Sequence, residues 1–241
     1  MIPTYNALDK FGDGRPTYGG YSNTIVANED FTVHIPEKLN LAAAAPLLCA
    51  GITTYSPLKH WKIGKGHKVA VLGLGGLGHM AVKFAVALGA DVTVLSTSPK
   101  KETDANRLGA QHFVVTSDAA QVEKVKDSFD CIVDTVAAEH DLNFYLSLLG
   151  LNGTLICVGI PVEGIHLNGP LEAFTLIGGR KSIVGSQCGS IAEIQEMLDF
   201  CAEHDIVADI ELIDIKDIHA AYDRMLKGDV KYRFVIDMAT L

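Results

Sequence analysis

A glycine-rich turn between an apolar strand and an apolar helix constrains the fold of this chain more than any other feature. The run KVAVL at residues 68–72 predicts a buried strand, and Gly73, Gly75 and Gly78 follow it with the spacing G-x-G-x-x-G. Apolar residues repeat with helical spacing over residues 77–88, which predicts a helix directly after the turn. A strand, this turn and a helix, in that order, are typical of a pyrophosphate site, because the free N–H groups at a helix start attract anions.

Each glycine of the turn has its own expected role. Gly73 would allow the tight turn, Gly75 would let the backbone approach a pyrophosphate, and Gly78 would permit close packing of the helix on the strand. The turn therefore predicts a dinucleotide site, with a ligand-free glycine turn as the alternative. The residues expected to line the site here are Gly73, Leu74, Gly75, Gly76, Leu77 and Gly78.

Strands and helices alternate regularly after this turn. Uniformly apolar strands that alternate with helices indicate a parallel sheet covered on both faces. We therefore expect an α/β fold with a doubly wound, six-stranded parallel (Rossmann) sheet. Besides the first strand and helix, the pattern predicts strands at residues 92–95, 112–115, 130–133, 154–158 and 182–184, and helices at 100–108, 119–126, 140–149 and 171–177.

The end of the second predicted strand indicates which dinucleotide binds. NAD sites usually carry Asp or Glu at this point, where the carboxylate accepts from the ribose 2′-hydroxyl. This chain instead has Ser96, Thr97 and Ser98, followed by Lys100 and Lys101. Hydroxyl and ammonium groups would bind a 2′-phosphate through charge-assisted hydrogen bonds, so the sequence favours NADP(H). A helix cap followed by two solvated lysines is the alternative interpretation.

Three more residues near the turn are interpreted from their positions. Thr135 and Gly159 follow the fourth and fifth predicted strands. Because ligands bind at the carboxyl edge of a parallel sheet, both are expected to contact the cofactor. His79 stands in the first turn of the glycine helix, where a positive charge is unfavourable, so we expect a neutral and packed imidazole.

The pattern changes on either side of the alternating region. We expect a loop over residues 1–20, a hairpin built from residues 22–27 and 31–34, and two short helices within residues 41–58, which Pro46 and Gly51 interrupt. The tail after Gly185 is expected to pack against this hairpin. Its predicted elements are a helix at residues 191–201, a strand at 210–213, a helix at 218–225 and a strand at 232–237.

Composition bears on partners and location. The 241 residues carry a formal net charge of −9, and an acidic surface repels phosphate backbones, so we expect no nucleic-acid partner. No apolar run approaches the roughly 18 to 20 residues that a membrane span needs. The first residues lack the charged and apolar regions of a secretory signal, so we expect no membrane partner and a cytoplasmic location. The five cysteines form no C-x-x-C pair for a zinc ribbon.

Several longer segments together resemble one known family. They are GGYSNTIV, APLLCAGITTYSPLKHW, GLGGLGHMAVKFA, LGADVTVLSTSPKK, FDCIVDTVAAEHDL, EMLDFCAEHDIVADIELI and DVKYRFVIDM. From about Gly19 to its end, the chain resembles the cinnamyl alcohol dehydrogenase group of the zinc-dependent medium-chain alcohol dehydrogenases. The resemblance implies an NADP(H)-dependent oxidoreductase that interconverts aldehydes and primary alcohols with the help of Zn²⁺, acting on a small aldehyde or alcohol substrate.

The resemblance also implies a domain plan. Residues 1–49 would be the remnant of a GroES-like catalytic domain, residues 50–187 the NADP-binding Rossmann domain, and residues 188–241 the return of the chain to the catalytic domain. The implied assembly is a homodimer that joins two sheets through the edge strand at residues 182–184.

Further site residues come from the resemblance alone. Cys49 matches a catalytic zinc ligand, Thr53 matches a catalytic and cofactor-contacting position near the nicotinamide, and Ser186 matches another cofactor contact. The G-H-E motif and the clustered cysteines of the family are absent from this sequence. The resemblance therefore implies an N-terminally shortened chain with an incomplete zinc site, weak or inactive alone. Two alternatives stay open: a zinc-free, quinone-reductase-like enzyme and a non-catalytic NADP(H)-binding module.

Overall fold

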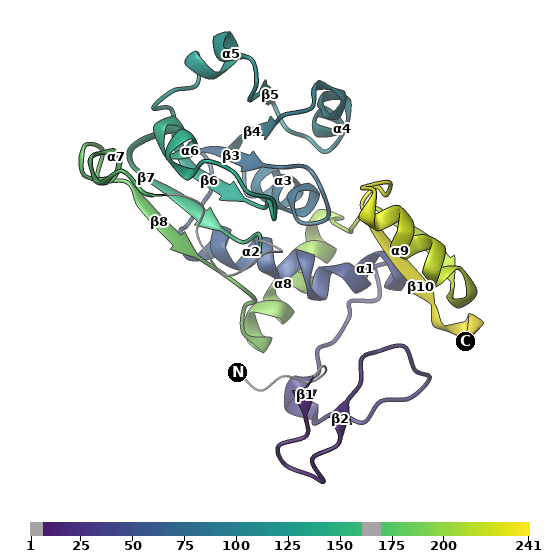
Figure 1. Cartoon of the computed structure of the whole chain (residues 1–241). Helices are drawn as coiled ribbons and strands as arrows, with labels where there is room; N and C mark the ends of the chain where they lie inside the picture. Colours follow the sequence, from purple (N-terminus) through teal and green to yellow (C-terminus); the bar gives the residue numbers. More distant parts are fainter. Residues whose placement is uncertain (1–6, 161–169) are drawn as a thin grey trace.

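A six-stranded parallel sheet lies at the centre of the computed structural model, which describes residues 7–160 and 170–241 (Figure 1). The strand order is β5-β4-β3-β6-β7-β8. The order reverses between β3 and β6, and the crevice at such a reversal is where ligands bind in doubly wound sheets. The predicted fold class is confirmed. The strands are β3 (Lys68–Leu72), β4 (Asp91–Ser96), β5 (His112–Val115), β6 (Phe129–Asp134), β7 (Leu149–Cys157) and β8 (Ser182–Gly185).

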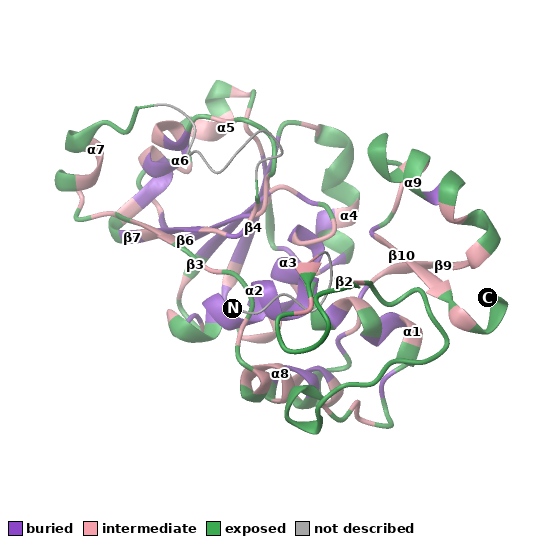
Figure 2. Cartoon of the chain, turned by 60° about the horizontal axis from the view of Figure 1, so that its bottom comes forward, coloured by how far each residue is buried: buried purple, intermediate pink, exposed green. Residues whose placement is uncertain are grey.

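The uniformly apolar strands serve two separate cores, one on each face of the sheet. Successive side chains of a strand point to opposite faces. In β3, Val69 and Val71 belong to one core, whereas Ala70 and Leu72 belong to the other. Figure 2 shows these central strands as buried along their length. Burial on both faces explains why the strands read as continuous apolar runs rather than as alternating ones.

Helices cover both faces of the sheet. Tyr55, Phe84 and Leu198 bring three of them into the first core, and Leu142 and Leu146 bring another into the second core. The predicted helices all occur, several of them shorter than the pattern indicated. They are α2 (Ala50–His60), α3 (Gly78–Ala87), α4 (Glu102–Arg107) after the 3-10 turn η3 (Pro99–Lys101), α5 (Ala119–Glu123), α6 (Leu142–Leu148), α7 (Ala173–Ile177) and α8 (Ile191–His204).

The segment before the sheet forms α1 (Leu41–Ala44), the 3-10 turn η2 (Ala45–Leu48) and α2. The helical stretch is interrupted, as predicted, but the break falls at Cys49 rather than at Gly51. Gly51 lies inside α2, where a Cβ would sit 2.9 Å from the sulfur of Met197, so this glycine serves close helix packing.

No single helix in the described part of the chain is long and apolar enough to cross a membrane. The bent pair formed by residues 41–48 and 50–60, which meet at 57°, passes that test by length and composition only when the two are taken together.

The predicted hairpin at residues 22–27 and 31–34 is wrong. The described N-terminal strands are instead β1 (Ala7–Leu8) and β2 (Pro16–Thr17), an antiparallel pair inside the predicted loop, and residues 29–31 form a 3-10 turn, η1. Val26 is 95% exposed and Ile25 70% exposed. β-branched residues form strands where a neighbouring strand and a core cover them; among the described residues, Ile25 and Val26 have neither, and Val33 packs against the first core without a neighbouring strand.

The tail carries β9 (Ile210–Asp214), α9 (Ile218–Leu226) and β10 (Arg233–Asp237) after α8. β9 and β10 pair in parallel with each other and form a two-stranded sheet of their own. Since there is no hairpin, the tail does not pack on one. It packs instead against an irregular segment, where Gln195 of α8 bonds both the N–H and the carbonyl oxygen of His34 and the hydroxyls of Tyr21 and Tyr222 lie 3.1 Å apart.

Candidate cofactor-binding site

The glycine turn after β3 has the geometry that its sequence predicts. Gly73 has a φ of +86°, in the left-handed region that favours glycine, and its N–H donates to the carbonyl oxygen of Leu95 at 3.0 Å. A Cβ on Gly78 would lie 2.1 Å from the carbonyl oxygen of Gly73. These two glycines therefore bring the start of α3 against the end of β3.

Gly75 and Gly76 differ in what lies in front of them. A Cβ on Gly75 would meet nothing within 4 Å, so its backbone faces open space. A Cβ on Gly76 would lie 2.5 Å from Nε of Arg233, and this guanidinium donates to the carbonyl oxygen of Gly76 at 3.4 Å. An open backbone beside a guanidinium and the start of a helix fits the approach of a pyrophosphate.

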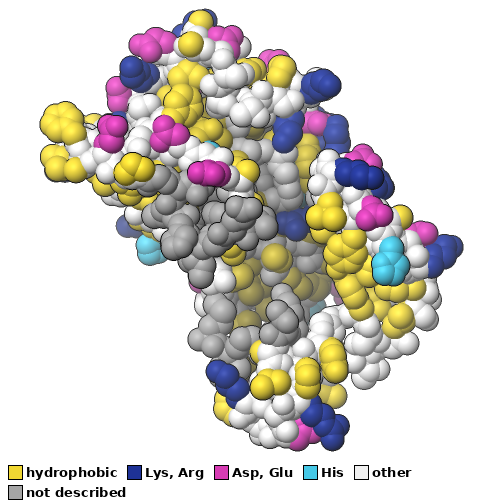
Figure 3. Space-filling view, viewed as in Figure 1, with side chains coloured by type: hydrophobic (Ala, Val, Ile, Leu, Met, Phe, Trp, Pro, Cys, Tyr) yellow, Lys and Arg dark blue, Asp and Glu magenta, His cyan; other side chains and the backbone are white. Residues whose placement is uncertain are grey.

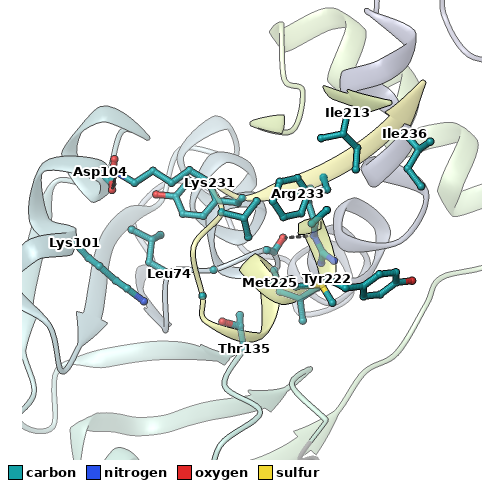
Figure 4. A pocket seen from close by; sticks show the side chains of 18 of the residues that line it. Leu74, Lys101, Asp104, Thr135, Ile213, Tyr222, Met225, Lys231, Arg233 and Ile236 are labelled. Carbon is teal, nitrogen blue, oxygen red and sulfur yellow. Dashed lines mark hydrogen bonds and ion pairs between the residues drawn. The ribbon is translucent and has the colours of Figure 1, made fainter. Parts of the chain in front are cut away.

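A cavity of about 740 Å³ opens on this turn. In Figure 3 it appears as a hollow between the sheet and the C-terminal tail. Figure 4 shows Lys101 and Asp104 at one end of it, with Tyr222 and Ile236 toward the other. Its volume lies within the range of known cofactor sites. Eight of the predicted cofactor residues line it: Leu74, Gly75, Gly76, Leu77, Ser98, Lys100, Lys101 and Thr135.

The loop after β4 brings Ser98, Lys100 and Lys101 to one end of the cavity. Ser96 is buried, and its Oγ accepts from the N–H of Ser98 at 3.2 Å. Ser96 therefore shapes the loop from behind, and Thr97 is exposed away from the cavity lining. One hydroxyl and two ammonium groups at this end provide donors for a phosphate.

Thr135 and Gly159 hold the carboxyl ends of the central strands together. The Oγ1 of Thr135 donates to the carbonyl oxygen of Leu72 at 2.8 Å, which ties the end of β6 to the end of β3 beside the turn. Gly159 does not line the cavity. A Cβ there would lie 2.4 Å from the carbonyl oxygen of Val136, so Gly159 permits the close approach of the segments after β6 and β7.

Three residues taken from the family resemblance lie outside the cavity lining. Cys49 is exposed at the break between η2 and α2, and Thr53 is buried in α2, where its N–H donates to the carbonyl oxygen of Cys49 at 3.0 Å. Ser186 follows β8, and its N–H donates to the carbonyl oxygen of Cys157 at 3.1 Å. Their side chains are not gathered with the phosphate-binding candidates.

The donor set around Cys49 does not fit a complete zinc site. Within residues 7–160 and 170–241, no group of three or more His, Cys, Asp and Glu side chains is placed to hold a metal ion. A catalytic zinc site takes about three protein ligands and keeps one position open. The described residues thus offer Cys49 as a candidate ligand without the partners that such a site requires.

The tail supplies a wall of the cavity that the sequence interpretation missed. The sequence does carry a signal, because Lys231 and Arg233 flank Tyr232 at the start of the last strand and cations there suit a phosphate. What the sequence does not show is that this segment lies opposite the glycine turn. Tyr21 and Asp104 were also missed, together with Ile213, Ile218, Ala221, Tyr222, Met225, Gly228, Val230, Lys231, Tyr232, Arg233, Phe234 and Ile236.

His79 joins the glycine turn to the tail. Its Nδ1 lies 3.1 Å from the carbonyl oxygen of Gly75, its Nε2 accepts from the N–H of Asp209 at 3.3 Å, and its ring stacks on Tyr232 with centroids 4.8 Å apart. Burial lowers the pKa of His79 to about 4, although the Gly75 carbonyl opposes that shift. The imidazole is therefore neutral and packed, as predicted.

An ion-pair network continues this junction. Asp209 Oδ1 lies 2.5 Å from the Nζ of Lys83 on α3, and its Oδ2 lies 2.6 Å from the guanidinium of Arg107 on α4. Partial burial would raise the pKa of Asp209, but hydrogen bonds from Lys83 and Arg107 outweigh it and the pKa is lowered. A tail carboxylate is thus fixed to two helices beside the cofactor cavity.

A second buried pair lies at the end of β6. The Nε2 of His140 is 2.8 Å from Asp134 Oδ2, and the Nδ1 of the same ring is 2.7 Å from the carbonyl oxygen of Ala138. The Asp134 hydrogen bond raises the pKa of His140, against the opposing effect of burial. This pair closes the loop that begins with Thr135 and so helps to hold Thr135 at the cavity.

Comparison with known proteins agrees with this geometry. A family model for zinc-binding dehydrogenases matches residues 76–203. Over all 241 residues, the chain is 56% identical to NADP-dependent alcohol dehydrogenase C 1 of Mycolicibacterium smegmatis, covering 67% of that protein. The chain thus spans about two thirds of the length of this relative.

Two solved structures are similar over nearly the whole chain. A cinnamyl alcohol dehydrogenase from Sorghum bicolor matches with a TM-score of 0.92 and 46% identity, covering 97% of this chain and 66% of that one. CAD from Helicobacter pylori, complexed with NADP(H), matches with a TM-score of 0.88 and 45% identity, covering 98% of this chain and 66% of that one.

Proposed function

Since the chain belongs to the zinc-binding dehydrogenase family, we propose that it binds NADP(H) at the glycine turn and acts as an oxidoreductase that interconverts aldehydes and primary alcohols. One observation carries the proposal: the open backbone of Gly75 shares a cavity with Ser98, Lys100 and Lys101. The turn suits a pyrophosphate, and the hydroxyl and ammonium groups suit a 2′-phosphate. NADP(H) carries both groups at the two positions.

The residues of this chain would bind and orient the cofactor. The bound nicotinamide would supply or accept the hydride. The glycine turn and Arg233 would hold the pyrophosphate, and His79 would keep the turn in place through the carbonyl oxygen of Gly75. The aldehyde or alcohol substrate rests on the names of the relatives, which are alcohol and cinnamyl alcohol dehydrogenases. We propose as well that Zn²⁺ assists this reaction and that Cys49 is the zinc ligand that this chain supplies.

A coenzyme titration tests the binding proposal. The fluorescence of NADPH and of NADH is followed as the purified chain is added, and a dissociation constant is obtained for each. We expect NADPH to bind at least about tenfold more tightly, because the additional phosphate gains charge-assisted hydrogen bonds. Equal constants for the two coenzymes would overturn the preference for NADP(H).

A turnover assay separates the possible functions. NADPH oxidation is followed with an aromatic aldehyde, with and without added Zn²⁺. Turnover that requires zinc supports the alcohol dehydrogenase proposal. Zinc-independent turnover would favour a zinc-free reductase, and tight binding without turnover would favour an NADP(H)-binding module.

A homodimer through the edge of the sheet is also proposed. In the described residues β8 pairs with β7 on one side only, so its other edge could pair with a second copy. Phe174 and Ile177, just before β8, are 81% and 73% exposed. Sedimentation velocity at micromolar concentration is expected to give a dimer, and a monomer over the whole range would contradict the proposal.

A further inference from the structure

An acidic side chain lies where the proposed cofactor places its 2′-phosphate. Asp104 lines the cavity together with Ser98 and Lys101. Lys101 ends η3 and Asp104 stands three residues later in α4, so the two lie on the same side of the helical segment (Figure 4). An unneutralised carboxylate at this place would repel a phosphate and would favour a ribose hydroxyl instead.

Asp104 is neutralised from the opposite wall of the cavity. Its Oδ2 lies 2.6 Å from the Nζ of Lys231, which the tail supplies just before β10. A second cation, Arg107 on α4, lies farther away, with its Nε 3.8 Å from Asp104 Oδ1. The side chain of Asp104 is only 16% exposed, whereas that of Lys231 is 65% exposed, so the lysine reaches from the solvent side to a largely buried carboxylate.

The residue next to Lys231 also points to a ligand at this place. Tyr232 lines the cavity and is 7% exposed, and among the described residues its hydroxyl is the buried side-chain atom that has no hydrogen-bond partner. Buried hydroxyls ordinarily find a partner, and a phosphate or ribose oxygen in the cavity would provide one. Lys231 therefore stands next to a residue whose buried hydroxyl lacks a hydrogen-bond partner within the described part of the chain.

We propose that Lys231 is a coenzyme-specificity residue of this chain, because it neutralises Asp104 and so lets the cavity accept a 2′-phosphate. The inference rests on the proposed binding of NADP(H) at the glycine turn. The preference for NADPH then depends on both walls of the cavity. Ser98, Lys100 and Lys101 lie on the wall next to the sheet, and Lys231 lies on the wall that the tail forms. Without Lys231, the carboxylate of Asp104 would disfavour a 2′-phosphate, as the acid of an NAD site does from its own position.

Coenzyme titrations of matched variants test the proposal. Dissociation constants for NADPH and NADH are measured for the wild type, Lys231→Met, Asp104→Asn and the double variant. In Lys231→Met we expect NADPH to bind about tenfold more weakly, while the NADH constant changes less than about twofold, because only NADPH carries the 2′-phosphate. Adding Asp104→Asn should restore most of the affinity for NADPH, since the repelling charge is gone.

Two further variants serve as controls. Lys227→Met removes an exposed lysine of the same tail that does not line the cavity, and it should leave both constants unchanged. Lys231→Arg keeps the charge and should keep the preference. If Lys231→Met folds poorly, the comparison of Lys231→Arg with Lys231→Gln at equal thermal stability replaces it.

The outcomes separate this inference from the function on which it rests. A wild type without preference for NADPH would overturn the proposed function itself. A wild type that prefers NADPH, with an unchanged NADPH-to-NADH ratio in Lys231→Met, would overturn the role of Lys231 alone. An equal loss for both coenzymes, or a failure of Asp104→Asn to restore NADPH binding, would also overturn it, because neutralisation of Asp104 predicts neither result.

Discussion

Two turns in this chain precede largely buried helices, yet they differ in the groups that could bind a ligand. The turn at residues 73–78 leads into α3 and presents open backbone at Gly75 inside a cavity lined from five parts of the chain. The break at Cys49 leads into α2 and presents an exposed thiol, with no cluster of further metal-binding side chains among the described residues.

The difference follows from the chemistry of the two ligands. A phosphate is bound largely by backbone N–H groups, and one contiguous strand, turn and helix can provide them. A zinc ion is bound by side chains, and about three of these must converge from different segments. A phosphate site can therefore be complete within a local motif, whereas a metal site depends on segments that meet only in the folded molecule.

Gly78→Ala should give the largest effect on the first turn. The new Cβ would meet the backbone oxygen of Gly73, which cannot move away without disturbing β3, so we expect a loss of about 3 kcal/mol in the free energy of unfolding. Urea unfolding measures the loss. Wild-type stability in this variant would mean that α3 does not need its close approach to the strand.

The acid sensitivity of the same turn should come next in size. His79 has a pKa of about 4 in the folded chain, below the ordinary value of 6.5, so the unfolded chain takes up a proton on acidification before the folded chain does. Its stabilising contribution is present above pH 6.5 and is lost as the pH falls toward 4. From about pH 7 to pH 5 the expected loss is about 2 kcal/mol.

The variant His79→Phe isolates this contribution. The aromatic ring can still stack on Tyr232, but it takes up no proton. Urea unfolding at several pH values should show a shallower decline in acid for the variant than for the wild type. Parallel declines in the two proteins would show that His79 is not a buried neutral group.

Gly75→Ala separates ligand binding from folding. A Cβ at Gly75 meets nothing within 4 Å, and its backbone does not need glycine, so the melting temperature should stay the same. The methyl group would stand where a pyrophosphate approaches, and we expect NADPH to bind about tenfold more weakly, or about 1.4 kcal/mol. Unchanged affinity would place the pyrophosphate elsewhere.

Cys49→Ser should give the smallest effect. The thiol is exposed and outside the cavity lining, so the free energy of unfolding should change by less than about 0.5 kcal/mol and the NADPH constant by less than about twofold. Metal analysis of the purified chain completes the comparison between the two turns. Stoichiometric zinc in the wild type that is lost in Cys49→Ser would show that Cys49 belongs to a working metal site.

Much of the sheet could be predicted because its signals are local. The strand at residues 68–72 and the helix after the turn follow from apolar runs and spacing, and both occur within one residue of the predicted bounds. The hairpin at residues 22–34 failed for the converse reason. A β-branched run shows only that a strand could form there, and whether a neighbouring strand covers it depends on the rest of the fold.

The candidate site divides in the same way. Eight predicted residues line the cavity, and all of them come from the glycine turn, the loop after β4 or the end of β6. Most of the missed residues come from the tail, more than a hundred residues after the glycine turn, and Tyr21 and Asp104 are the exceptions. No local pattern shows that Lys231 meets Asp104 or that Arg233 lies over Gly76.

By itself, the sequence determined the phosphate cradle and the sheet that carries it, because a strand, three glycines and a helix encode that geometry within one short segment. The tertiary structure decided which charges face the cradle. The folding of β10 beside the glycine turn brought two cations and a buried tyrosine to the cavity, and it neutralised an aspartate that would otherwise repel a phosphate. Such contacts depend on where distant segments meet, and packing rather than local sequence determines that.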